Sequence, residues 1–272
     1  MFEVSEDRAA AYQKYFLRLM AKFERGMSVR FYPILQQTYE EVGELFKHGH
    51  HDFPAAYERH TSRVRIQLEK EYRNLLAYFG TFAFDQFKKA YSKGVRIPEK
   101  KGMEDIYWQD VSHWAKFTAL KKAADISKTT KGLINLLIRR GMRDGLSNDD
   151  IVKEIIEKRK TFNKVRAVRI VRTETHSAVN KATDASVKST GYKHIRIWRA
   201  ALDDRVRGAD PRDIANHLAA NGQKRDLDVA FDIKYGASVD KLMYPGDPTA
   251  RAAQTVNCRC VLTYTTQRAR IE

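Results

Sequence analysis

The spacing of apolar side chains changes its period near residue 191, and this change constrains the fold more than any other feature. In about the first 155 residues, apolar positions recur at steps of three and four, the spacing of one helix face. The first such stripe consists of Tyr12, Phe16, Leu19 and Phe23. Residues 194–200 instead alternate between polar and apolar, as in a strand. The sequence therefore predicts an α+β protein with a mainly helical N-terminal part and a small C-terminal α+β module.

The N-terminal part is predicted to contain several separate helices. The apolar period resumes over residues 34–46 after Pro33, a residue that a helix tolerates in its first turn. Two more helices are expected over about residues 108–122 and 133–142.

The second half is predicted to contain a capped helix and a long one. Ser147 has an acidic residue three positions later, which resembles a capping box, so a helix is expected over about residues 148–160. A long helix should follow from about residue 163 to residue 190, with Gly191 in position to end it. Mostly small side chains form a seam along one face of this helix, starting at Val165. The shorter elements expected next are a helical piece around residues 211–220 and a strand over residues 256–265.

Length and cysteine content bound the class of protein. With 272 residues, 43% of them hydrophobic, the chain can form one large domain or two modest ones. It has no uncharged apolar run of about 18 residues, so no membrane span is expected. The acidic N-terminus lacks the apolar stretch of a secretory signal, and two cysteines are too few for a disulfide framework. Synthesis in a reducing cytoplasm is therefore expected.

The chain is strongly basic, with 50 Lys and Arg against 34 Asp and Glu, a net charge of +16. Such an excess attracts phosphate polyanions in a salt-dependent way without reading base sequence. Between residues 157 and 199, 12 basic residues stand against 3 acidic ones, a balance of +9. This segment is either a solvated helix face or a surface that works beside DNA or an acidic partner. On the second interpretation, the residues that would face DNA are Lys158, Arg159, Lys160, Arg166 and Arg169.

Both cysteines of the chain stand one residue apart, at Cys258 and Cys260. In a strand these positions share one face, and a disulfide across so short a loop would be strained. A metal site would need further ligands, of which His217 is the first candidate and Asp204 or Asp247 the next. The pattern favours two small buried thiols over zinc, because sites with a strong zinc signal use paired Cys-x-x-Cys motifs.

A polar cluster precedes the cysteines and has two interpretations. Carboxylate pairs with a histidine serve metal-assisted hydrolysis, so the cluster could cleave phosphodiesters. The favoured alternative is an ion-pair and hydrogen-bond network that holds a loop-rich module together. The residues concerned are Asp203, Asp204, Arg205, Arg207 and His217.

The predicted long helix carries polar residues in its middle, Arg172-Thr173-Glu174-Thr175 and then Asn180. Buried polar groups need partners, and the Asp-rich loops downstream are expected to supply them. A catalytic role for Glu174 is the less favoured alternative.

In this order, the C-terminal motifs resemble those of the phage Mu protein F-like family, minor head proteins of tailed bacteriophages. The resemblance covers about residues 130–265, and Asn-Cys-Arg-Cys at its end is the most specific piece. Many relatives carry Cys-x-x-Cys where this chain has Val206-Arg207, and residues 208–216 lengthen the gap before His217. The family motif falls on Arg172, Glu174, Asn180, Trp198, Asp204, Arg205, Arg207, His217, Gly222, Asp247, Asn257, Cys258 and Cys260.

The resemblance implies a structural virion protein, present in few copies near the portal vertex of the head and made in the host cytoplasm. It implies a role in head assembly, and in DNA packaging or ejection, with the portal protein, the major capsid or scaffolding protein and packaged DNA as partners. It implies no enzymatic activity and no cofactor; zinc held by His217, Cys258 and Cys260 is the less favoured alternative, and the two departures from the family pattern weaken it. Residues 1–130 would form a helical docking region and residues 131–272 the head morphogenesis domain. The alternatives are a metal-dependent nuclease or toxin-like transferase that uses Glu174, Asp204 and His217, and a non-specific DNA-binding module.

Overall fold

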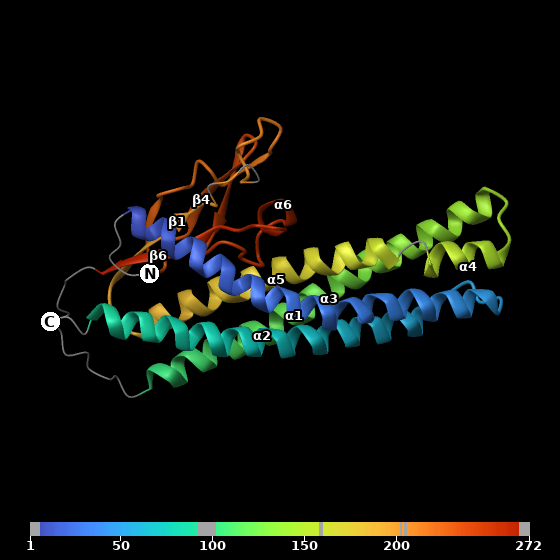
Figure 1. Ribbon diagram of the computed structural model, residues 1–272, viewed down its shortest axis with the longest axis horizontal. Helices are drawn as coiled ribbons and strands as arrows, with labels where there is room; N and C mark the ends of the chain where they lie inside the picture. Colours follow the sequence, from blue (N-terminus) through green and yellow to red (C-terminus); the bar gives the residue numbers. More distant parts are fainter. Residues whose placement is uncertain (1–5, 92–101, 158–159, 202, 204–205, 267–272) are drawn as a thin grey trace. The chain divides into compact units, whose positions relative to one another are not determined.

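The computed structural model describes residues 6–91, 102–157, 160–201, 203 and 206–266 (Figure 1). Five long or medium helices come first and six short strands with one short helix follow, which confirms the predicted α+β class. The helices are α1 (Glu6–Lys47), α2 (Pro54–Tyr91), α3 (Met103–Arg143), α4 (Asn148–Ile156), α5 (Lys160–Ser189) and α6 (Ala252–Thr255). The strands are β1 (His194–Arg199), β2 (Ala215–Asn216), β3 (Lys224–Asp226), β4 (Phe231–Tyr235), β5 (Ser238–Leu242) and β6 (Val261–Thr266).

The helices are fewer and longer than the apolar pattern predicts. Pro33 lies inside α1 and does not start a new helix. A proline in a helix interior costs about 3 kcal/mol, but Phe31 and Leu35 on either side are fully buried, and their packing keeps the helix continuous. The two helices expected over residues 108–122 and 133–142 are both part of α3, because Ala123, Ile126 and Thr130 continue the buried stripe between them.

The start of α4 confirms the capping prediction. The Ser147 side chain accepts a hydrogen bond from the Asp150 backbone N–H at 3.2 Å, and its hydroxyl donates to the Asp150 carboxylate at 2.6 Å. The hydroxyl of Ser147 and the carboxylate of Asp150 thus form a hydrogen bond with each other. The same hydroxyl also accepts from one of the backbone N–H groups that have no partner within the helix at its start. The buried face of this helix consists of Ile151 and Ile155.

The chain divides into two compact units, each built from separate segments. Unit 1 comprises residues 1–23, 72–114 and 172–272, and unit 2 comprises residues 24–71 and 115–171. Each unit contains residues from both sides of residue 130.

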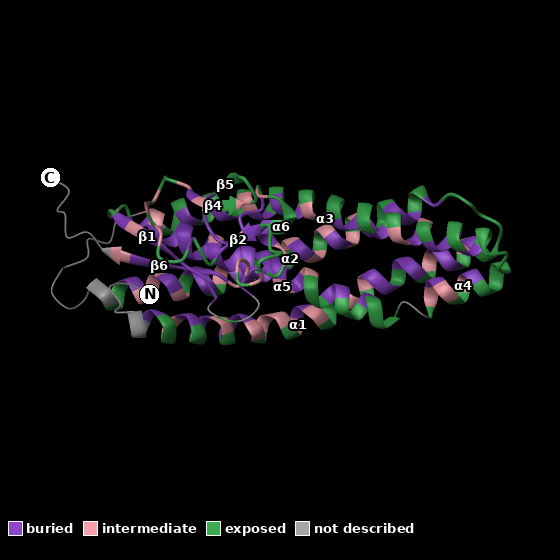
Figure 2. Cartoon of the chain, turned by 90° about the horizontal axis from the view of Figure 1, so that it is seen from above, coloured by how far each residue is buried: buried purple, intermediate pink, exposed green. Residues whose placement is uncertain are grey.

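Unit 2 is a helical unit with an aromatic and aliphatic core. Buried residues of its helices face inward while exposed ones alternate with them along each ribbon (Figure 2). Gly141 allows α4 to approach α3, since a Cβ there would lie 2.4 Å from a side-chain carbon of Ile151. The core cluster consists of Tyr39, Val42, Phe46, Phe53, Ala56, Tyr57, Ile134, Leu137, Ile138, Ile151 and Ile155.

His60 is buried in unit 2 between two threonine hydroxyls. Its Nδ1 lies 2.7 Å from Thr38 Oγ1 and its Nε2 lies 3.1 Å from Thr130 Oγ1. The Thr130 hydroxyl donates to the Ile126 carbonyl and accepts from Arg166, so it is an acceptor for an Nε2 proton. Burial, with the nearby Arg166 as a second cause, lowers the pKa of His60 to about 4. The neutral ring is therefore the folded form.

Acid should destabilise the protein through His60 over a defined window. The unfolded chain binds this proton below the ordinary pKa of 6.5 and the folded chain only below about 4. The His60 contribution is therefore complete above pH 6.5 and falls by about 3 kcal/mol as pH drops to 4. Urea unfolding of wild-type and His60→Gln protein between pH 7.5 and 4 should show a difference curve with that slope. His50→Gln, at an exposed position, should follow the wild type; a pH-independent difference for His60→Gln would contradict the account.

Unit 1 contains both sheets. One sheet has the order β3-β1-β6 and the other β2-β4-β5, and all neighbouring strands are antiparallel. The helical piece expected around residues 211–220 is instead β2 and turns, because Ala215 and Asn216 pair with β4. Trp198 of β1 is fully buried in the core of this unit, together with Phe231, Leu242 and Tyr264.

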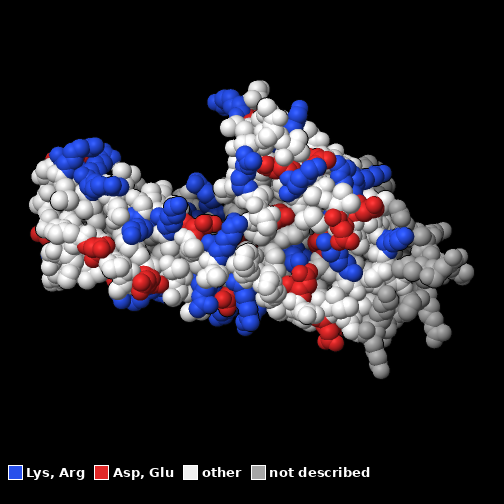
Figure 3. Space-filling model, turned by 180° about the vertical axis from the view of Figure 1, so that it is seen from behind, with Lys and Arg blue, Asp and Glu red and all other residues white. Residues whose placement is uncertain are grey.

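The described basic side chains do not gather in a single patch on the face of the protein that Figure 3 shows. On the face that Figure 3 shows, Lys and Arg occur in several separate groups with Asp and Glu between them. No helix among the described residues has both the length and the apolar character that crossing a membrane requires.

Candidate functional site

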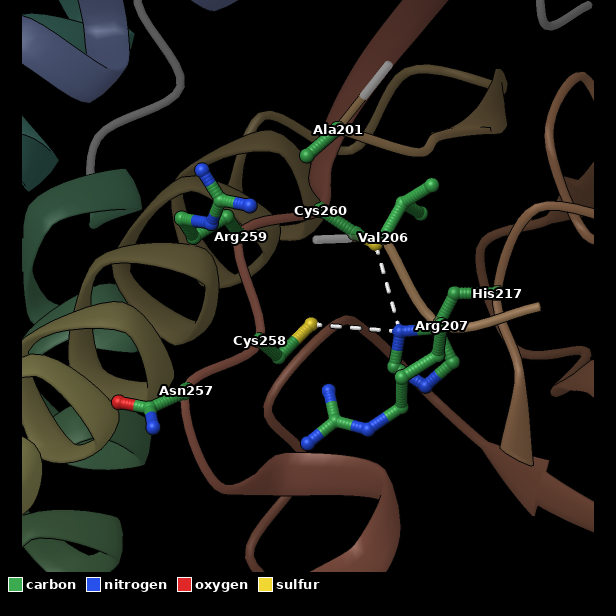
Figure 4. Close-up of a pocket in the computed structure, with 8 residues that line it drawn as sticks. All are labelled: Ala201, Val206, Arg207, His217, Asn257, Cys258, Arg259 and Cys260. Carbon is green, nitrogen blue, oxygen red and sulfur yellow. Dashed lines mark hydrogen bonds between the residues drawn. The ribbon is translucent and has the colours of Figure 1, made fainter. Parts of the chain in front are cut away.

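His217, Cys258 and Cys260 converge in a buried cluster of unit 1 (Figure 4). The His217 Nδ1 lies 3.5 Å from Cys258 Sγ and 3.4 Å from Cys260 Sγ. All three side chains are at most 2% exposed, and their candidate ligand atoms lie within 4.8 Å of one another. The cluster lies in a small pocket lined by Ala201, Val206, Arg207, His217, Asn257, Cys258, Arg259 and Cys260.

The cysteines lie immediately before β6, which corrects the prediction that both belong to a strand. They follow α6 through Asn257, which has a φ of +57°, and the Cys258 backbone N–H donates to the Thr255 carbonyl at 3.1 Å. The Cys260 carbonyl accepts a 3.4 Å hydrogen bond from the Asn180 side chain of α5. Both sulfurs nevertheless point to one place, so the expected proximity of the two thiols is present without strand geometry.

His217 is held by its backbone and by an aromatic contact. Its N–H donates to the Arg207 carbonyl at 2.9 Å, directly after β2. Its ring meets Trp198 edge to face, with centroids 5.5 Å apart and an interplanar angle of 84°. Gly222 supports the same corner: it has a φ of +81°, and its N–H donates to the Trp198 carbonyl at 2.8 Å.

The other ring nitrogen of His217 has a partner that sets the tautomer. Gln254 Oε1 lies 2.9 Å from His217 Nε2, and the Gln254 amide nitrogen donates to the Asp240 carboxylate at 2.9 Å. A carboxylate accepts only, so the Gln254 oxygen must face the ring and the Nε2 must carry the proton. Arg251 holds Asp240 in turn through a 2.8 Å ion pair. In the neutral imidazole, it is therefore the unprotonated Nδ1 that faces the two sulfurs.

The two thiols differ in their tendency to ionise. The hydrogen bond from Cys260 lowers the pKa of Cys258 well below its usual range, and His217 assists while burial opposes the shift. Burial, and then the adjacent Cys258, raise the pKa of Cys260. The pair therefore favours a thiolate at Cys258 and a thiol at Cys260. A thiolate beside an imidazole is a nucleophile or a metal ligand, and the described residues that line the pocket include no carboxylate to act as general base.

The polar residues in the middle of α5 have partners both on another helix and in the downstream loops. The buried Glu174 carboxylate accepts a 2.6 Å hydrogen bond from the Tyr72 hydroxyl of α2. Asn180 donates to His176 Nδ1 at 3.1 Å and to Cys260. The Thr173 hydroxyl accepts from the Asn257 backbone N–H at 3.1 Å, which ties α5 to the start of the cysteine segment. Arg172 is half-buried on the same helix.

The loop residues of the predicted motif stabilise the loops themselves. The buried Asp247 carboxylate accepts from the Met243 N–H at 3.0 Å and from the Thr249 N–H at 2.9 Å, which closes a turn. Arg207 donates to the Val256 carbonyl, and Arg259 forms a bidentate ion pair with Asp203. Asp204 and Arg205 lie outside the described residues.

Of the residues expected to face DNA, some are exposed, one is buried and two lie outside the described residues. Lys160 and Arg169 are exposed on α5, whereas Lys158 and Arg159 lie outside the described residues. Arg166 cannot face DNA: it is only 8% exposed, and its guanidinium donates to Thr130 Oγ1 and to the Ile126 carbonyl. The exposed face of α5 therefore includes Lys160 and Arg169 but not Arg166.

Comparison with known proteins finds a family match for the region of the chain that contains this cluster. Residues 133–263 match the family of phage Mu protein F like proteins. The chain is also 23% identical over 249 residues to YqbB, an uncharacterised protein of Bacillus subtilis (strain 168), covering 85% of this chain and 78% of that protein. No solved structure matches the chain. The match spans just under half of the chain, and the motifs of the C-terminal part agree with it, so this region is similar to the phage Mu protein F-like family.

Proposed function

We propose that the protein is a structural minor head protein of a tailed bacteriophage that acts in head assembly. Similarity to this family supports a role in phage head morphogenesis. The observation that carries the structural role is the use of the chemistry-capable side chains. Glu174 is bound by Tyr72, Asp203 by Arg259, and Asp247 by backbone donors of its own turn. Each of these groups makes contacts that stabilise the module, which supports a structural role.

The partners follow from the same proposal. The protein would lie at the portal vertex on the inner side of the procapsid, with the portal protein and the major capsid or scaffolding protein as neighbours. The helices that precede the family domain would provide the docking surface. An internal position would also bring the protein into contact with packaged DNA, for which a net charge of +16 is favourable.

Co-purification with the portal tests this proposal directly. The full chain and the portal protein of the same phage would be expressed together, and the portal rings isolated by size. The chain should elute with the rings, and should also appear in procapsids assembled with them. Elution of the chain as a free protein under conditions in which rings and procapsids form would overturn the proposal.

A second assay separates a structural protein from a nuclease. The purified chain is incubated with plasmid DNA and Mg²⁺ or Zn²⁺, alongside His217→Ala. The expected result is intact plasmid with both proteins. Cleavage by the wild type that is lost in His217→Ala would instead establish the enzymatic alternative.

Binding to DNA should be non-specific and steeply salt-dependent. Removing one phosphate-binding side chain should reduce the slope of log affinity against log salt by about 1, so a Lys160→Ala/Arg169→Ala variant should reduce it by about two. Fluorescence anisotropy with unrelated duplexes between 50 and 300 mM salt measures the slope. The control is Lys70→Ala/Arg73→Ala, which removes the same charge from exposed positions outside the basic segment. Equal slopes for both variants would show that α5 does not provide the DNA-facing surface.

A further inference from the structure

We propose that His217, Cys258 and Cys260 bind one zinc ion. The geometry of the three ligand atoms supports this. Tetrahedral zinc with Zn–S bonds of ~2.3 Å and Zn–N bonds of ~2.05 Å sets its sulfur and nitrogen ligands about 3.6 Å apart. The His217 Nδ1 lies 3.5 and 3.4 Å from the two sulfurs. Both nitrogen–sulfur distances therefore already fit a zinc tetrahedron, and all three ligand atoms lie within 4.8 Å of one another.

The hydrogen bonds of the His217 imidazole orient the ring as in a metal ligand. Gln254 accepts the Nε2 proton, so the lone pair of Nδ1 is directed at the sulfurs. A histidine that ligates a metal commonly donates its other N–H to such a partner, which fixes the ring and strengthens its basicity. Here a hydrogen bond and then an ion pair extend in series from Gln254 through Asp240 to Arg251. Two buried thiols that only pack against each other would not require this series.

Charge and burial favour the same ion. Zn²⁺ with two thiolates and a neutral imidazole has a formal charge of zero, so the site can be buried without an uncompensated charge. Sulfur and imidazole ligands select zinc over Mg²⁺ or Ca²⁺, which prefer oxygen. The three side chains leave one position of a tetrahedral zinc ion, which a water molecule would fill, and the cluster lines a small pocket from which water can reach it.

Metal analysis of the full chain, purified with its affinity tag removed and its thiols reduced, tests the site. We expect one zinc per chain for the wild type, and less than a tenth of that for Cys258→Ser, Cys260→Ser or His217→Ala. His113→Ala, which removes an exposed histidine of the same unit, should keep the full content. Folded, reduced wild type with zinc content no higher than that of His217→Ala after exposure to the ion would overturn the proposal.

Cobalt and a positioning variant keep the test informative if a ligand variant fails to fold. Co²⁺ should bind the apo wild type at one per chain, with the charge-transfer absorption of Co–thiolate bonds and the visible bands of tetrahedral coordination. Gln254→Leu should keep that stoichiometry and spectrum but bind about 10–100-fold more weakly, because the ring loses its orienting acceptor. A wild-type cobalt spectrum without thiolate bands would refute the site. Unchanged affinity in Gln254→Leu would refute the role given to the hydrogen-bond chain.

Discussion

Replacing Arg196 by methionine is expected to lower the free energy of unfolding by roughly 3–5 kcal/mol. Arg196 is completely buried in β1, and its guanidinium uses all five of its N–H groups. It donates to the Asp184 carboxylate at 3.3 Å and to the Met243 carbonyl at 2.5 Å. The remaining N–H groups donate to the Asp226 and Val229 carbonyls, at distances of 2.7 to 3.3 Å.

The loss of stability is large because the groups that accept hydrogen bonds from Arg196 remain buried in the variant without their donor. Asp184 is 2% exposed, and without Arg196 its carboxylate keeps only the 3.3 Å contact with Lys188. Burial already raises the pKa of Asp184, so the variant should also take up a proton there at a higher pH than the wild type. Three backbone carbonyls lose their donors in the same step, and each unsatisfied buried group adds a cost of about 1–3 kcal/mol.

The matched control for Arg196 is its cross-strand neighbour. Arg225 of β3 lies opposite Arg196, and it forms an ion pair with Asp232 at a partly exposed position. Arg225→Met should cost about 1 kcal/mol or less, because exposed ion pairs contribute little. Denaturant unfolding followed by circular dichroism compares the two. Equal losses in both variants would show that burial of the Arg196 network does not determine its contribution.

Trp198→Ala is expected to cost about 3–5 kcal/mol, the range for large buried aromatic residues. Trp198 packs against Phe231, with ring centroids 5.4 Å apart, and against the edge of His217. The substitution would therefore open a cavity at the centre of the unit 1 core and release one side of the His217 ring. We expect the same variant to weaken zinc binding, since the ring would lose a contact that orients it.

An exposed tryptophan gives the comparison. Trp108 of α3 is 41% exposed and contacts Tyr107. Trp108→Ala removes the same number of atoms but should cost about 1 kcal/mol or less, as surface substitutions do. Unfolding midpoints of both variants measured under one condition decide the matter, and a cost for Trp198→Ala no greater than that of Trp108→Ala would contradict the packing described here.

Local sequence signals correctly predicted the structural elements that are determined by residues close to them in the sequence. The Ser147 cap, the end of α5 near Gly191 and the β1 strand depend on neighbouring residues, and each is found where the pattern placed it, to within a few residues. The continuity of α1 through Pro33 was not predictable in this way. It depends on packing of Phe31 and Leu35 against other segments, which no local pattern contains.

The candidate site shows the same division. The sequence identified His217, Cys258 and Cys260 because cysteine and histidine are rare and chemically distinctive. It did not identify Gln254, Asp240 or Tyr72, since amide, carboxylate and phenol groups are common and their role here comes from contacts far along the chain. The α5 seam was misjudged at its start for a related reason: Val165 is 55% exposed, while the neighbouring Arg166 is buried through its hydrogen bonds.

The measurement that most directly tests the central claim is quantitative mass spectrometry of purified phage heads, combined with imaging of the portal vertex. A structural minor head protein should be present in every head at a small, constant number of copies relative to the portal protein, and density for its helices should lie at that vertex. Heads that assemble, package DNA and infect while containing none of this chain would contradict the account.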